Sequence, residues 1–154
     1  MRFLSVVLLF LLTVTTVQAE ENKVVASLHS DRDAIIAGEP LTLAVVHDIA
    51  PDWHVYWKNP GDSGSISRFH FNLPEGFTIS EAQWPTPEAI PYDILINYGH
   101  SHQAIYTFTL RPPETLSTDE IMLNAELEWL VCKDICIPET QNVSLTLPVA
   151  QENK

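Results

Sequence analysis

The chain has 154 residues, with 20 acidic against 8 basic side chains, which gives it a formal net charge of −12. A protein this acidic repels phosphate backbones and anionic lipid headgroups, which excludes nucleic-acid binding and membrane-surface binding as leading functions. The length is enough for one domain with a hydrophobic core of its own.

The N-terminus has the pattern of a secretory signal peptide. Arg2 supplies a positive charge, residues 3–17 are almost wholly apolar, and Val17-Gln18-Ala19 offers the small residues that a signal peptidase recognises. Because the apolar run is short and acidic residues follow it at once, we expect cleavage after Ala19; the alternative is an uncleaved N-terminal anchor. We expect no membrane span in the mature chain. The predicted organisation is a signal peptide over 1–19, one domain over 20–149 and a polar tail over 150–154.

Short stretches of alternating apolar residues, separated by turn signals, recur through the rest of the chain. An apolar period of 3.6 residues nowhere persists over three turns, which favours strands over helices. The breaker-rich segment 59–64 ends one strand, and the proline-rich segment 84–91 can be neither a helix nor a central strand. The pattern predicts an all-β fold, an immunoglobulin-like β-sandwich. In chain order, the expected strands cover residues 24–28, 41–46, 53–57, 69–73, 77–79, 105–110, 121–131 and 143–147.

The two cysteines, Cys132 and Cys136, are the candidates for chemistry. Along the strand 121–131 the odd-numbered residues form the core face, so Cys132 falls on the opposite face and we expect it to point outward. Four extended residues span roughly 13 Å, whereas the Cα atoms of bridged cysteines lie about 4.4–6.8 Å apart. Residues 133–135 must therefore form a tight turn if a bridge forms. A bridge that closes so small a loop stabilises little, and redox activity and structural bridging stay equally open at this point.

The neighbours of the cysteine pair suggest its direction of reaction. Four acidic residues stand close in sequence, against Lys133 alone, and negative neighbours disfavour a thiolate, so we expect a pair that donates electrons. Cys136 precedes Ile137-Pro138 and we expect it to be the more enclosed cysteine, which would leave Cys132 as the accessible one. The four acidic residues are Glu126, Glu128, Asp134 and Glu139.

A copper site is an alternative interpretation of the same residues. The C-x-x-x-C spacing resembles the copper-binding loop of Sco-type proteins, in which two thiolates and a distant histidine hold the metal. Those proteins have a thioredoxin fold, and no β-α-β pattern occurs here. Two thiols alone do not make a structural zinc site, and His100-x-His102 is better explained as a solvated loop. We therefore assign no metal site and expect no cofactor. The other histidines considered are His47, His54 and His70.

Four sequence motifs occur together in a fixed order. They are WHVYWKNPGDSG at 53–64, WPTP at 84–87, YG at 98–99 and WLVCKDICIPE at 129–139. Together they resemble the N-terminal periplasmic domain of the DsbD and ScsB thiol:disulfide interchange proteins, and the resemblance spans residues 24–147. The C-x-x-x-C spacing and the PGDSG loop are more similar to the ScsB branch.

This resemblance implies an immunoglobulin-like sandwich with a reversible dithiol, acting in the periplasm as a thiol:disulfide oxidoreductase of the protein-disulfide reductase type. By position, Cys132 and Cys136 match the redox pair. Asn97, Tyr98 and Gly99 match a cap loop that shields the cysteines, with Asn97 where DsbD carries phenylalanine. His54 and Tyr56 fall on the strand whose aromatic residues line the site.

The resemblance also implies partners. Domains of this family are reduced by a thioredoxin-like domain of the same system and pass electrons to thioredoxin-fold proteins of the periplasm, including those of cytochrome c biogenesis. The family's membrane-embedded and thioredoxin-like domains are absent from this sequence, so we expect a separately encoded membrane protein as the electron donor, or a truncated gene. Two other hypotheses stay open: a non-catalytic binding module with a structural disulfide that docks a partner through the Tyr98 loop, and a copper-handling protein that uses both cysteines and a histidine.

Overall fold

The computed structural model describes residues 22–150. The predicted signal peptide at 1–19 and residues 151–154 of the predicted tail lie outside the described residues. Ten β-strands and no helix occur within the described part. Accordingly, none of residues 22–150 belongs to a helix long and apolar enough to cross a membrane.

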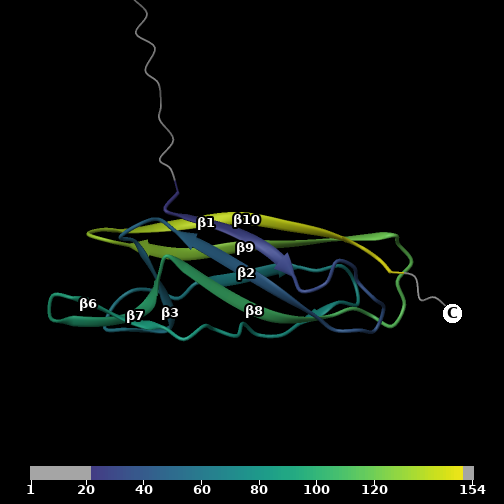
Figure 1. The fold of residues 1–154 in the computed structure, drawn as a ribbon, viewed down its shortest axis with the longest axis horizontal. Coiled ribbons are helices and arrows are strands. Elements are labelled where there is room, and N and C mark those ends of the chain that lie inside the picture. Colours follow the sequence, from purple (N-terminus) through teal and green to yellow (C-terminus); the bar gives the residue numbers. More distant parts are fainter. Residues whose placement is uncertain (1–21, 151–154) are drawn as a thin grey trace, which may run out of the picture.

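The strands form two antiparallel sheets whose longer members run along the long axis of the molecule (Figure 1). The four-stranded sheet has the order β1-β2-β8-β5 and the six-stranded sheet contains β10-β9-β3-β7-β6, with β4 also paired to β9. The first sheet comprises β1 (Val24–Ser30), β2 (Leu41–Ile49), β8 (Gln103–Arg111) and β5 (Thr78–Ile79). The second comprises β10 (Cys136–Pro148), β9 (Glu120–Cys132), β3 (His54–Gly61), β7 (Leu95–Ser101), β6 (Glu88–Tyr92) and β4 (Arg68–Asn72).

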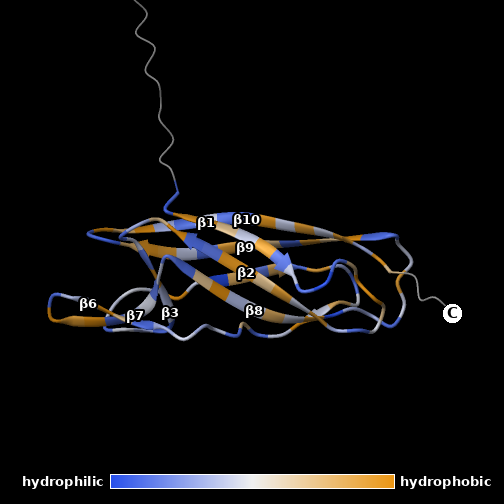
Figure 2. Ribbon diagram, in the orientation of Figure 1, coloured by the Kyte–Doolittle hydropathy of each residue, from blue (hydrophilic) through white to orange (hydrophobic). Residues whose placement is uncertain are grey.

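The hydrophobic core lies between the two sheets. In β2 and β9 every second side chain is buried, which is the period of a strand with one face against a core. Figure 2 shows the same alternation as apolar and polar residues along the ribbons. The all-β sandwich predicted from the sequence is thus confirmed. Its largest fully buried side chains include Tyr106, Ile35, Leu43, Leu110, Leu123 and Leu127.

Two strands were not expected. β6 and β7 form a hairpin within and after the proline-rich segment, where the sequence suggested irregular chain. Pro91 is tolerated because β6 is the last strand of its sheet and needs no partner on its outer side. Asn97, Tyr98 and Gly99, expected in a loop, therefore lie in the strand β7.

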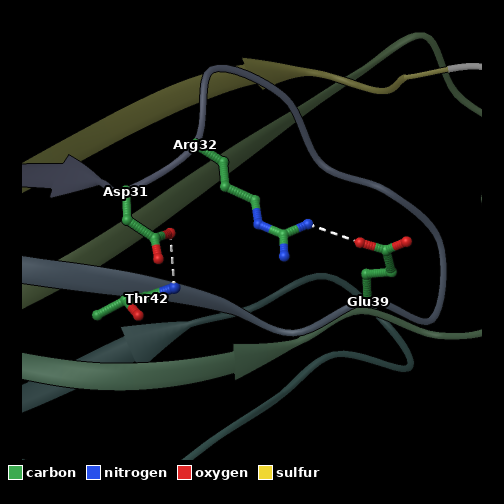
Figure 3. Close-up of polar contacts among 4 residues, drawn as sticks. All are labelled: Asp31, Arg32, Glu39 and Thr42. Carbon is green, nitrogen blue, oxygen red and sulfur yellow. Dashed lines mark hydrogen bonds and ion pairs between the residues drawn. The ribbon is translucent and has the colours of Figure 1, made fainter.

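The connection from β1 to β2 is held by side chains at its two ends. Asp31 accepts a hydrogen bond from the backbone N–H of Thr42 at 2.8 Å, and Arg32 lies 2.7 Å from the Glu39 carboxylate (Figure 3). Both members of the ion pair are exposed, so it contributes little to stability. This connection lies outside the residues that line the disulfide cavity.

Candidate functional site

Cys132 and Cys136 form a disulfide at the tip of the β9–β10 hairpin. Cys132 ends β9, Cys136 begins β10, and the two residues lie directly opposite each other in the ladder, with their Cα atoms 4.1 Å apart. Residues 133–135 form the connecting loop, in which the N–H of Lys133 donates to the carbonyl of Ile135 at 3.0 Å. The tight turn that the spacing demanded is therefore present.

The two cysteine residues differ in their exposure. The Cys132 residue is only 2% exposed, whereas Cys136 is exposed. The expectation that Cys132 would be the accessible cysteine is wrong. Cys132 does face away from the core, as the alternation along β9 predicted, but β3 pairs beside it and side chains from β3 and the β6–β7 hairpin cover it.

A small cavity of about 120 Å³ adjoins both cysteines. The β9–β10 tip and the β6–β7 hairpin lie at the same end of the molecule, at the left of Figure 1, and both contribute to the cavity. The strand β3 and the segment that follows it supply the remaining wall. The lining residues other than the two cysteines are His54, Tyr56, Ser63, Tyr92, Asn97, Lys133, Asp134 and Ile135.

Tyr56 is the side chain that touches both sulfurs. Its hydroxyl lies 3.1 Å from Cys132 Sγ and 3.9 Å from Cys136 Sγ. The ring is almost fully buried and packs against the backbone of Gly64, where a Cβ atom would overlap three ring carbons. Gly64 has a φ of +96°, which a glycine adopts without strain. The breaker-rich segment 59–64 thus has a specific role, since it provides the space for the ring.

His54 lies across the ladder from Cys132. Its ring packs edge-on against Tyr56, with centroids 5.3 Å apart, and its Nε2 atom is buried with no hydrogen-bond partner among the described residues. Burial lowers the pKa of His54, against a weaker opposing effect of Glu88. The imidazole is therefore neutral at pH 7 and places no positive charge beside the sulfurs.

The three residues expected in a cap loop have different positions. Asn97 lines the cavity and is almost fully buried; its Oδ1 atom accepts hydrogen bonds from the backbone N–H of Ser63 at 2.9 Å and from the Ser63 hydroxyl at 3.0 Å. Tyr98 alternates with Asn97 along β7 and so points to the opposite face. Gly99 packs against the backbone of Val55, with no room for a side chain.

The expectation that Tyr98 lines the site is therefore wrong. The aromatic residue of the hairpin that reaches the cavity is Tyr92, which is 50% exposed. Neither Tyr92 nor Ser63 was singled out from the sequence. The pairing of β6 with β7 could have found Tyr92, because Tyr92 lies opposite Leu95 and so faces the same side as Asn97.

The acidic surroundings expected for the disulfide are also mostly absent. Glu126 and Glu128 precede Cys132 on β9 by six and four residues, which places them roughly 20 and 13 Å away along the strand. Glu139 points inward, where its carboxylate accepts hydrogen bonds from the Trp129 indole and from the backbone of β1 and the residue before it. Only Asp134 lines the cavity. Three of the four negative charges on which we based the expectation of an electron-donating pair are therefore not beside the disulfide.

The histidines considered for copper are dispersed. His47 and His100 point into the core, His70 is exposed on β4, and His102 lies at the turn between β7 and β8. His54 is the histidine that shares the cavity with the sulfurs. Across residues 22–150, no group of three or more histidine, cysteine or acidic side chains is arranged to hold a metal ion.

The motif order, the fold and the disulfide at a hairpin tip can be compared with known proteins. The family model for the N-terminal region of the thiol:disulfide interchange protein DsbD matches residues 21–148. The chain belongs to this family. With the Cys132–Cys136 disulfide, it has the cysteine pair of a thiol:disulfide interchange domain. A comparison with curated proteins found no significant match.

Two solved structures share the fold of this DsbD N-terminal-type domain. The N-terminal periplasmic domain of ScsB from Proteus mirabilis superposes with a TM-score of 0.57 at 19% identity, over 77% of this chain and 44% of that one. The DsbD N-terminal domain of Neisseria meningitidis, in the reduced form, superposes with a TM-score of 0.50 at 12% identity, over 83% and 91% of the two chains. The chain thus spans less than half of the ScsB structure, and the likeness confirms the immunoglobulin-like all-β fold.

Proposed function

We propose that this domain exchanges disulfides with thioredoxin-fold proteins in the periplasm, through Cys132 and Cys136. The observation that carries the proposal is the asymmetry of the pair: Cys136 is an exposed residue at a hairpin tip, while Cys132 is buried with its sulfur against Tyr56. Exchange requires one sulfur that a partner can reach and a second that stays inside and resolves the mixed disulfide. A purely structural bridge needs neither property.

The exposed cysteine sets the order of the steps. When the domain is oxidised, a thiolate of the partner attacks Cys136 Sγ; its electron pair forms the new disulfide, and the electrons of the Cys132–Cys136 bond remain on Cys132 Sγ. When the domain is reduced, the Cys136 thiolate attacks the partner's disulfide. Cys132 then attacks Cys136 Sγ and releases the partner's thiolate. Cys136 is thus the residue that bonds to the partner.

Exposed apolar side chains lie at the same end of the molecule as the exposed cysteine. Ile135 is 64% exposed in the loop before Cys136, and in the β6–β7 hairpin Tyr92 is 50% exposed and Ile94, at the hairpin turn, is 87% exposed. Exposed apolar clusters next to a reactive group favour contact with another protein rather than with a small polar substrate.

A trapping experiment tests this function. Cys132→Ala removes the resolving thiol and leaves Cys136 exposed, so with its leader in the native host it should accumulate a mixed disulfide with a thioredoxin-fold protein, identified by mass spectrometry. Cys136→Ala leaves only the buried Cys132 and should trap much less. If neither variant forms a mixed disulfide while a known redox protein in the same cells does, the binding-module hypothesis replaces exchange.

A redox titration separates the remaining alternatives. The wild-type domain, equilibrated in glutathione and dithiothreitol buffers, should show a reversible couple between about −180 and −270 mV, the range of thioredoxin-like exchange proteins. A couple well below about −300 mV would indicate a structural bridge. If the two thiols stay reduced and unreactive when Cu(I) is present, but not in its absence, the result would favour copper handling.

A further inference from the structure

The hydroxyl group of Tyr56 is a hydrogen-bond donor directed at the disulfide. A disulfide sulfur carries no hydrogen, so in the 3.1 Å contact the phenol O–H donates and Cys132 Sγ accepts. The second sulfur, Cys136 Sγ, is farther from the same oxygen, at 3.9 Å. The donor therefore favours the sulfur of the buried Cys132 over that of the exposed Cys136.

The surrounding residues keep the hydroxyl in this position. The Tyr56 residue is 2% exposed, its ring lies against the Gly64 backbone and packs in a T-shaped arrangement with the His54 ring, and its strand pairs with β7 at Gly99. Burial raises the pKa of Tyr56, and this effect is larger than the opposing effect of a hydrogen bond with Ser63. The hydroxyl therefore keeps its proton over the pH range in which thiols exchange.

The other polar groups of the cavity are poorly suited to the same task. Lys133 is paired with Asp52 on the surface at 3.0 Å, and Asp134 carries a negative charge that would oppose a thiolate. Tyr92 is half exposed, and the buried Nε2 atom of His54 makes no hydrogen bond. Among the described residues 22–150, Tyr56 is the cavity residue that donates a hydrogen bond to the Cys132 sulfur.

We propose that Tyr56 is a catalytic residue of disulfide exchange, which stabilises the thiolate of Cys132. In the step that breaks the Cys132–Cys136 bond, the electron pair of that bond stays on Cys132 Sγ, and the Tyr56 hydroxyl donates its hydrogen bond to the new negative charge. Water does not reach this buried sulfur readily, and burial without a donor disfavours the charged form. A hydrogen bond to a charged acceptor is stronger than one to a neutral acceptor, so the contact gains strength as the bond breaks. This proposal rests on the exchange function proposed above.

The hydroxyl can be removed while the ring stays in place. Tyr56→Phe keeps the shielding of the disulfide but loses the donor, so reduction of the oxidised domain by dithiothreitol should be about tenfold slower or more, as loss of one charge-assisted hydrogen bond implies. The control is Tyr98→Phe, which removes a hydroxyl on the far face of β7 and should leave the rate unchanged. If Tyr56 acts only as a shield, Tyr56→Phe will be reduced at the wild-type rate or faster, and the proposal is overturned.

A second measurement observes Cys132 directly. In the Cys136→Ala background, Cys132 is the only thiol, and its ionisation can be followed by the ultraviolet absorbance of the thiolate. Adding Tyr56→Phe should raise the pH at which this thiolate forms by about one unit or more, because one unit corresponds to the tenfold effect above. An unchanged titration would overturn the proposal even if the rate had changed, and urea unfolding of each variant shows whether the fold is intact.

The two proposals fail separately. Suppose that Tyr56→Phe slows reduction of the disulfide by dithiothreitol and shifts the thiolate titration, but Cys132→Ala traps no protein. The role of Tyr56 then stands, and exchange with thioredoxin-fold partners fails. If Cys132→Ala traps a partner and Tyr56→Phe behaves as wild type, exchange stands and the role of Tyr56 fails.

Discussion

The backbone of Gly64 lies against the ring of Tyr56, so that a Cβ atom at position 64 would overlap the ring. This contact connects the loop after β3 to the buried cysteine, because the hydroxyl of the same ring contacts Cys132 Sγ. The position of the loop and the position of the donor are therefore coupled.

We predict that Gly64→Ala is more destabilising than the same substitution at Gly76. Both glycines have a positive φ, +96° and +84°, and the backbone strain of alanine there is of order 1–3 kcal/mol. At Gly76 the new Cβ would meet the Pro113 side chain at 3.1 Å, whereas at Gly64 it would overlap the Tyr56 ring. Urea unfolding of both variants measures the difference, and equal losses would mean that the ring moves aside freely.

Reduction of the disulfide should lower the melting temperature only slightly. The bridge joins residues that are already opposite each other in a ladder running the full length of β9 and β10, and it closes a loop with only three residues between the cysteines. The chain-entropy estimate for so small a loop is at most about 2 kcal/mol, or several degrees. Thermal unfolding of the oxidised and reduced domains tests this. Loss of the fold on reduction would instead indicate a structural bridge.

Tyr92, rather than Tyr98, should shield the disulfide. Tyr92 lines the cavity from the β6–β7 hairpin, and Tyr98 points to the other face of the same hairpin. Tyr92→Ala should therefore speed reduction by dithiothreitol, with little loss of stability because the side chain is half exposed. Tyr98→Ala is the matched control and should leave the rate unchanged. The reverse result would show that Tyr98 moves over the sulfurs in solution.

The domain should become less stable as the pH falls below about 6.5, in part because of His47. Burial, and to a smaller extent His100, lowers the pKa of His47 to about 3, against a weaker opposing effect of Asp48. Between the unfolded pKa of about 6.5 and the folded value, the unfolded chain binds a proton that the folded domain excludes, so the stability present above pH 6.5 is lost towards pH 3. The slope from this one group is at most about 1.4 kcal/mol per pH unit.

Substitution of His47 tests its share. Denaturant unfolding between pH 6.5 and 5 should show a smaller slope for His47→Leu than for the wild type, since leucine suits a site packed against Trp129 and Tyr106. His70→Ala, on the exposed side of β4, should keep the wild-type slope. A slope unaffected by His47→Leu would mean that His47 is already solvated in the folded domain.

Local properties of the chain could be predicted from the sequence. The period of two along 121–131 determines which side chains meet the core, and it also determines that Cys132 faces away from it. The distance limits of a disulfide determine that residues 133–135 turn tightly. These conclusions hold because strand pleating and bond geometry depend only on neighbouring residues.

The site itself depends on distant parts of the chain, and for that reason the sequence misled at several points. Whether Cys132 is exposed depends on Tyr56, 76 residues earlier, and on the β6–β7 hairpin. Glu139 is near the cysteines in sequence but turns inward, because the N–H groups of Lys23 and Val24 require an acceptor there.

The sequence alone therefore determined the all-β class, the facing of the strand that leads to the cysteines and the cysteine pair as the candidate for chemistry. Only the tertiary structure decided which cysteine is exposed, which tyrosine contacts the sulfur of the buried one and which charges stand near the pair. The physical reason is that alternation assigns a side chain to one face of a sheet, while burial on that face is decided by whichever strands and loops the fold brings over it.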